Sequence, residues 1–153
     1  MIHGCYDPVC HNEGDHICHN ASCIDKSHFE TPKLASQNCV PCRKSTPRLT
    51  EAVTKTLCQE IPDWRTVDHV LHPNDPSLGL FLQRDYFCGN FVNAIALVNQ
   101  IATIAEKQQH HPEIQIQYNW IIIKIWTHSI AGLSQNDFIL AAKIEEVIKE
   151  WKL

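Results

Sequence analysis

The chain has 153 residues, of which 44% are hydrophobic, and carries a formal net charge of -4 with a pI near 6.2. This size suits one domain with its own core, and an acidic chain without a basic patch argues against nucleic acid as an obligatory partner. No apolar run approaches the roughly 20 residues that a membrane-spanning helix needs, and the first residues show no secretory signal. We therefore expect a cytoplasmic protein that binds neither nucleic acid nor a membrane.

Cysteine and histidine divide the chain into two parts. Six of the 8 cysteines lie at or before Cys42, and half of the 10 histidines lie at or before His28. Residues 1–38 are also poor in aliphatic side chains, so they cannot bury a core alone. We assign residues 1–38 to a Cys/His-rich extension that is either flexible or metal-binding, and residues 39–153 to the folded domain.

Four cysteines of the extension stand in two pairs of x4 spacing and could supply a tetrahedral set of zinc ligands: Cys5, Cys10, Cys18 and Cys23. This spacing is looser than the familiar x2 knuckle. A flexible extension, or a start codon placed too far upstream, is therefore an alternative explanation to a structural zinc site. Cys39-x-x-Cys42 is a separate pair that could bind metal or undergo redox cycling. No thioredoxin-like pattern surrounds this pair, which weakens the redox interpretation.

Hydrophobic periodicity and turn residues predict seven elements in the order αββαββα. In chain order these are a helix over about 50–61, strands over 65–71 and 80–87 joined by a loop at 72–76, a helix over 91–108, strands over 113–118 and 121–127, and a helix over 134–151. Because hairpins dominate, we expect an α+β fold with a four-stranded, mainly antiparallel sheet and three helices on one face.

Three histidines fall at the same end of the second predicted hairpin. His110 and His111 precede its first strand, and His128 follows its second strand. The predicted turn brings positions 113 and 127 roughly opposite each other, so the three imidazoles should meet at the open end of the hairpin. Imidazole is suited to move protons near neutral pH. A polar surface patch or a chance metal site are the alternatives, although adjacent histidines are poor metal ligands because their side chains diverge.

Seven residues form a spaced pattern of an acid, His-His-Pro, an aromatic residue, a further histidine and an aspartate: Glu106, His110, His111, Pro112, Tyr118, His128 and Asp137. Three upstream segments accompany this pattern: Cys39-Val40-Pro41-Cys42, Pro47-x-Leu49-Thr50 and Ile61-Pro62-Asp63-Trp64. Together they resemble the pterin-4a-carbinolamine dehydratases, the 4a-hydroxytetrahydrobiopterin dehydratases, over roughly residues 39–148.

The resemblance implies a hydro-lyase that removes water from the 4a-hydroxytetrahydropterin left by aromatic amino acid hydroxylases. The product, quinonoid dihydropterin, can then be reduced for reuse, and no metal or nucleotide is needed. By this resemblance His110 and His128 form the acid–base pair, and His111 orients the pterin and can share in proton transfer. Four further residues would support the site or bind substrate: Glu106, Pro112, Thr127 and Asp137.

Several alternatives stay open. Asp137 could simply serve the N-terminus of the last helix, where negative charge is favoured, and we expect Tyr118 to be a core or pocket-wall aromatic. A rival function is that of a dimerisation cofactor, a protein-binding module with the same fold. A third is a metal-bound N-terminal module that recruits a partner to a dehydratase core. The resemblance also implies a homodimer or homotetramer.

Overall fold

A computed structural model describes residues 33–68 and 79–151 of the chain. All of these residues belong to one compact unit, Pro32–Leu153. The proposed zinc ligands Cys5, Cys10, Cys18 and Cys23, and the predicted loop at 72–76, lie outside the described residues. Within the described part of the chain, no helix is long and apolar enough to cross a membrane.

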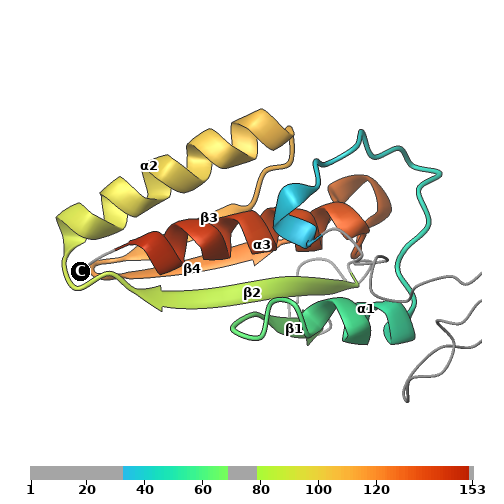
Figure 1. Cartoon of the computed structure of the whole chain (residues 1–153), viewed down its shortest axis with the longest axis horizontal. Coiled ribbons are helices and arrows are strands. Elements are labelled where there is room, and N and C mark those ends of the chain that lie inside the picture. Colours follow the sequence, from blue (N-terminus) through green and yellow to red (C-terminus); the bar gives the residue numbers. More distant parts are fainter. Residues whose placement is uncertain (1–32, 69–78, 152–153) are drawn as a thin grey trace, which may run out of the picture. The chain divides into compact units, whose positions relative to one another are not determined.

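The described residues form three α-helices and four strands (Figure 1). In chain order these are α1 (Glu51–Cys58), β1 (Arg65–Asp68), β2 (Leu80–Phe87), α2 (Phe91–Gln108), β3 (Glu113–Gln117), β4 (Trp120–Ile125) and α3 (Gln135–Glu150). Two short 3-10 helices are also described: η2 (Leu34–Ser36) precedes α1, and η4 (His128–Ile130) lies between β4 and α3. The predicted α+β class and the order αββαββα are confirmed. The limits of α2 also agree, because Asn90 caps its first turn by accepting a hydrogen bond from the Asn93 backbone N–H (2.8 Å).

The sheet has the strand order β1-β2-β4-β3, and every neighbouring pair is antiparallel. Helices α2 and α3 lie next to each other across one face of this sheet (Figure 1). The central strand β4 points Ile121, Ile123 and Ile125 into the core, where all three are fully buried. Alternate residues of a strand face opposite sides, so these three buried side chains account for every second residue of the apolar run 121–125.

The turn between β3 and β4 lies one residue earlier than the predicted strand limits of 118 and 121 place it. Gln117 pairs with Trp120, so the connection consists of Tyr118 and Asn119 alone, with Tyr118 in the left-handed backbone region (φ 56°). The prediction that positions 113 and 127 lie opposite each other is therefore wrong, since Glu113 pairs with Lys124. The expectation that Tyr118 is a core or pocket-wall residue is also wrong. Its side chain is 70% exposed because it stands at the tip of the hairpin.

Part of the segment that composition assigns to the extension packs with the domain. Leu34 is 2% exposed within the hydrophobic core, and its backbone N–H donates to Glu60 Oε2 at 3.2 Å. The Lys143 ammonium of α3 donates to the carbonyl of Ala35 at 2.8 Å. The packed part of the chain therefore begins at or before Leu34 rather than at Cys39.

This packing predicts a measurable stability effect. Truncating Leu34 to alanine should lower the free energy of unfolding by about 2–5 kcal/mol, because a buried leucine loses its transfer energy and leaves a cavity. Urea denaturation of wild type and Leu34→Ala, followed by tryptophan fluorescence, measures the difference. Val40→Ala, at an exposed position of the same segment, is the control and should change the free energy by less than about 0.5 kcal/mol. Equal effects of the two substitutions would contradict a core role for Leu34.

Candidate active site

A cavity of about 210 Å³ lies at the open end of the β3–β4 hairpin. Its lining comes from four parts of the chain and consists of Val40, Cys42, Gln109, His110, His111, Thr127, His128, Ser129 and Asn136. All three predicted histidines and the predicted Thr127 therefore line one cavity. The convergence expected from the hairpin occurs even though the predicted register is shifted.

The end of α2 determines how the two adjacent histidines are presented. Gln109 closes the helix in the left-handed region (φ 49°), and Pro112 prevents the helix from continuing. The two histidines follow Gln109 directly and precede strand β3. His110 turns inward and is 9% exposed, whereas His111 remains exposed. The two neighbours can therefore act differently on the same cavity.

Asp137 is the buried partner of His110. The Asp137 carboxylate is 0% exposed, and its Oδ1 lies 2.6 Å from Nε2 of His110. Its Oδ2 accepts hydrogen bonds from the Thr127 hydroxyl (2.8 Å) and from the Ser134 backbone N–H (2.6 Å). Asp137 therefore bonds to the N-terminus of α3 and to the imidazole of His110 at the same time. Its role at the start of the helix and its role in the site do not exclude each other.

The donors around Asp137 determine which nitrogen of His110 carries hydrogen. Oδ2 already accepts hydrogen bonds from two donors, and an ionised carboxylate accepts hydrogen bonds but donates none. The Ser134 hydroxyl, 2.7 Å from the Thr127 hydroxyl, completes this chain of donors by donating to Thr127. If Asp137 is ionised, the contact with its Oδ1 requires a hydrogen on His110 Nε2. Its Nδ1 has no hydrogen-bond partner among the described residues.

His111 forms a separate, exposed pair with Glu106. Its Nε2 lies 2.9 Å from Oε2 of Glu106, one turn back on α2. The hydrogen bond from His111, together with its charge, lowers the pKa of the Glu106 carboxyl below its usual range. Because both side chains are exposed, water screens this pair and its energy is small. The pair limits the orientation of the His111 ring at the rim of the cavity.

The loop that carries His128 is closed by backbone and side-chain hydrogen bonds. The Thr127 N–H donates to the carbonyl of Gly132 (2.9 Å), and the Arg48 guanidinium donates to the carbonyl of Ile130 (2.6 Å). The His128 ring lies 4.5 Å from the Trp126 ring, centroid to centroid, with a tilt of 37°. This contact gives the exposed imidazole one supported face, and an indole face also stabilises a protonated ring.

The structure places most of the predicted supporting residues either in the cavity wall or in a hydrogen bond to one of the histidines. Of the supporting set, Thr127 lines the cavity, Asp137 and Glu106 bond to the histidines, and Pro112 lies in the backbone just before β3. The lining residues that the sequence reasoning missed are Val40, Cys42, Gln109, Ser129 and Asn136. The Cys39-x-x-Cys42 spacing drew attention to one of them, but for metal or redox chemistry rather than for a cavity wall.

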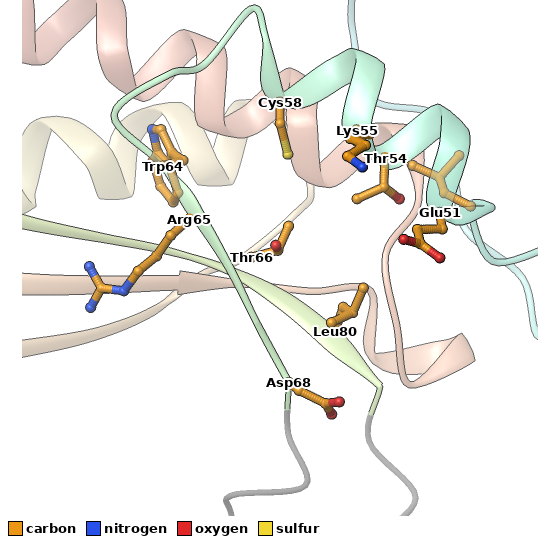
Figure 2. Close-up of a pocket in the computed structure, with 10 residues that line it drawn as sticks. Glu51, Thr54, Lys55, Cys58, Trp64, Arg65, Thr66, Asp68 and Leu80 are labelled. Atoms are coloured by element: carbon orange, nitrogen blue, oxygen red, sulfur yellow. The ribbon is translucent and has the colours of Figure 1, made fainter.

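A larger cavity, about 730 Å³, lies between α1 and the β1–β2 pair (Figure 2). Among the described residues its lining holds no histidine, and its Arg65 guanidinium is paired with Asp85 at 2.7 Å. Burial raises the pKa of the Cys58 thiol in its lining, so this sulfur is a weak nucleophile near neutral pH. Of these two cavities, the smaller one is lined by the three histidines of the predicted pattern. Within residues 33–68 and 79–151, no three metal-ligating side chains are grouped together.

Comparison with known proteins adds independent findings. Residues 47–147 match the sequence profile of the family described as "Pterin 4 alpha carbinolamine dehydratase". Proteins of Marinobacter nauticus and Rickettsia canadensis, both provisionally named pterin-4-alpha-carbinolamine dehydratases, are 35% and 38% identical to the chain. The matches cover 74% and 75% of this chain and 96% and 97% of theirs. A Brucella melitensis crystal structure titled transcriptional coactivator/pterin dehydratase is 28% identical, with a TM-score of 0.56, over 66% of this chain and 98% of its own.

Proposed function

The chain belongs to the pterin 4 alpha carbinolamine dehydratase family, whose members are hydro-lyases, and on that premise we propose that its histidine cavity dehydrates 4a-hydroxytetrahydropterin by general acid–base catalysis. In this reaction the C4a–O bond breaks and a double bond forms between C4a and the neighbouring ring nitrogen. That nitrogen loses a proton to a base, and the departing hydroxyl gains one from an acid to leave as water. The substrate therefore needs two proton-transfer groups at once.

The observation that carries the proposal is the pairing of His110 with the buried carboxylate of Asp137 at the wall of a cavity that His128 also lines. A negative partner stabilises the imidazolium that forms when His110 accepts a proton, so we assign the base role to His110. His128 is assigned the acid role, since its exposed ring exchanges protons with water and is supported by Trp126. Each transfer is worth about 10²–10⁴ in rate.

The remaining predicted residues have supporting roles in this proposal. His111, held by Glu106, orients the pterin at the rim, and Pro112 fixes the backbone that presents both histidines. Thr127 lines the cavity and ties Asp137 to the loop of His128. Both proton transfers fall to side chains of this chain, so we propose that catalysis needs no metal or nucleotide. Pterin recycling after an aromatic amino acid hydroxylase, in the cytoplasm, is the expected setting.

The substitution His128→Ala should lower the rate of dehydration at least about tenfold, because the hydroxyl would leave without its acid. The substrate is generated in situ, and its decay is followed through the ultraviolet absorbance of the 4a-carbinolamine. His128 is exposed, so wild type and variant should unfold at similar temperatures. If His128→Ala accelerates dehydration as strongly as wild type does, the assignment to the dehydratase family stands, but the histidine cavity is excluded as the active site. If wild type does not accelerate dehydration, the result would favour the function of a protein-binding module.

A second candidate function is protein binding, alone or beside catalysis. The Brucella melitensis relative is titled a coactivator as well as a dehydratase, and α2 exposes three apolar side chains, Phe91, Val92 and Ile95. Such a surface suits another protein chain, including a further copy of this one, so we propose a homodimer or homotetramer. Light scattering of wild type and Val92→Glu tests this proposal, and an unchanged oligomer would contradict the use of α2.

A further inference from the structure

The segment 38–42, which we call the strap, forms one wall of the histidine cavity. Val40 and Cys42 line the cavity from this segment. The strap precedes residues 47–147, the part of the chain that matches the family profile. The strap contains the upstream segment Cys39-Val40-Pro41-Cys42 of the family resemblance, but neither the profile match nor the histidine pattern places that segment at the site.

Asn136, in the first turn of α3, holds the strap in place through hydrogen bonds. Its side-chain Oδ1 accepts from the Val40 N–H (3.1 Å), while Nδ2 donates to the Val40 carbonyl (2.6 Å) and to Cys42 Sγ (3.1 Å). The residue is only 4% exposed, and these bonds use both hydrogens of its amide. Asn136 is adjacent to Asp137, so the fastening point of the strap and the partner of His110 belong to the same helical turn.

A second fastening comes from the end of α2. Gln108 Oε1 accepts from the Cys39 N–H (2.8 Å), and Gln108 Nε2 donates to Asn38 Oδ1 (3.2 Å). Gln108 lies two residues before His110. Both helices that position the His110–Asp137 pair therefore also hold the strap, which places this wall at a defined distance from the reacting groups.

We propose that the strap is the substrate-contacting wall of the cavity. Asn136 is then the positioning residue: by holding the strap in place, it sets the affinity of the cavity for a pterin. The inference rests on the proposed function. A flat heteroaromatic ring is bound through apolar and polarisable surfaces combined with a few polar groups. The Val40 methyls and the Cys42 sulfur offer such surfaces beside the polar histidine wall. The strap should hold the ring in place without taking part in proton transfer.

Thiol protection tests the contact on the wild-type protein. Iodoacetamide labelling followed by trypsin gives one peptide, Leu34–Arg43, that contains both Cys42 and Cys39. Burial, together with the charge of Asp137, raises the pKa of Cys39 to about 11, so Cys39 should react slowly and serve as the control in the same peptide. Saturating 7,8-dihydrobiopterin should slow Cys42 labelling at least about fivefold and leave Cys39 unchanged.

Binding of 7,8-dihydrobiopterin is measured in parallel by tryptophan fluorescence, which separates two kinds of failure. A pterin that binds without protecting Cys42 would overturn the strap proposal alone and leave the dehydratase proposal standing. A pterin that does not bind at all would count against the proposed function and overturn the strap proposal with it.

Kinetics of Asn136→Ser test the positioning role. Loss of the amide should raise KM about tenfold and change kcat by less than about twofold, because His110, His128 and Asp137 are intact. The matched control is Gln135→Ala, the neighbouring exposed residue, whose side chain bonds to Gln37 outside the strap. It should leave both constants unchanged. A fall in kcat at constant KM, or equal effects of both substitutions, would overturn the proposal.

Discussion

Replacing His110 by glutamine should lower kcat for carbinolamine dehydration by about 10²–10⁴, the usual contribution of a general base. Glutamine is chosen because its Nε2 can replace the imidazole Nε2 as a donor to Asp137, now at 2.6 Å from the histidine. The buried carboxylate then keeps a partner, whereas alanine would leave it without one. What glutamine cannot supply is the basic Nδ1 that we propose accepts the substrate proton.

The control for this substitution is a conservative change at the exposed neighbour. His111→Gln should alter KM more than kcat, because His111 is expected to orient the pterin rather than to accept its proton. Both variants should bind 7,8-dihydrobiopterin and retain the wild-type circular dichroism. A kcat for His110→Gln within about threefold of wild type would contradict the base role, since such a loss is far below that of a missing base.

Replacing Asp137 by asparagine should reduce both activity and stability. The Ser134 backbone N–H cannot rotate, so the amide oxygen must face it to accept its hydrogen bond. The amide nitrogen would then point at His110 Nε2, which can accept its hydrogen only if the imidazole proton moves to Nδ1. His110 would be locked in the wrong tautomer, and kcat should fall by about 10²–10⁴. Imperfect pairing of a buried group should also cost about 1–3 kcal/mol of stability.

Two measurements separate these effects. Histidine ring ¹⁵N spectra distinguish a hydrogen on Nε2 from one on Nδ1 and should show the switch for His110 in Asp137→Asn. Thr127→Val, which removes one donor from Oδ2 and keeps the carboxylate, should leave the tautomer unchanged and lower kcat by less than about tenfold. An unchanged His110 tautomer in Asp137→Asn would show that another group orients the ring.

The helices and the sheet followed from local rules, whereas the hairpin register did not. The Asn90 cap and the apolar stripe of α2 are local features, and both limits of that helix were predicted correctly. The β3–β4 register depends on which two residues form the turn. Tyr118 in the left-handed region is unusual for a large aromatic residue, so the sequence pattern assigned Tyr118 to the strand rather than to the turn. An alternating strand pattern alone does not determine which two residues form the turn.

The candidate site was predictable only in part. The histidines could be placed together because they flank one hairpin, whereas Asp137 was included in the site only through the family resemblance. The hydrogen bond between Asp137 and His110 depends on how α3 packs beside the end of α2, which no local pattern encodes. The same holds for Asn136 and Val40, which are far apart in the chain and meet only through tertiary packing.

The measurement that tests the central claim most directly is rapid mixing of preformed 4a-carbinolamine with wild type and with the double variant His110→Gln/His128→Ala. If these two imidazoles act as base and acid on one substrate, wild type should accelerate dehydration strongly. The double variant should keep less than about 1% of that acceleration while still binding 7,8-dihydrobiopterin. Equal acceleration by the two proteins would contradict the assignment of the histidine cavity as the active site.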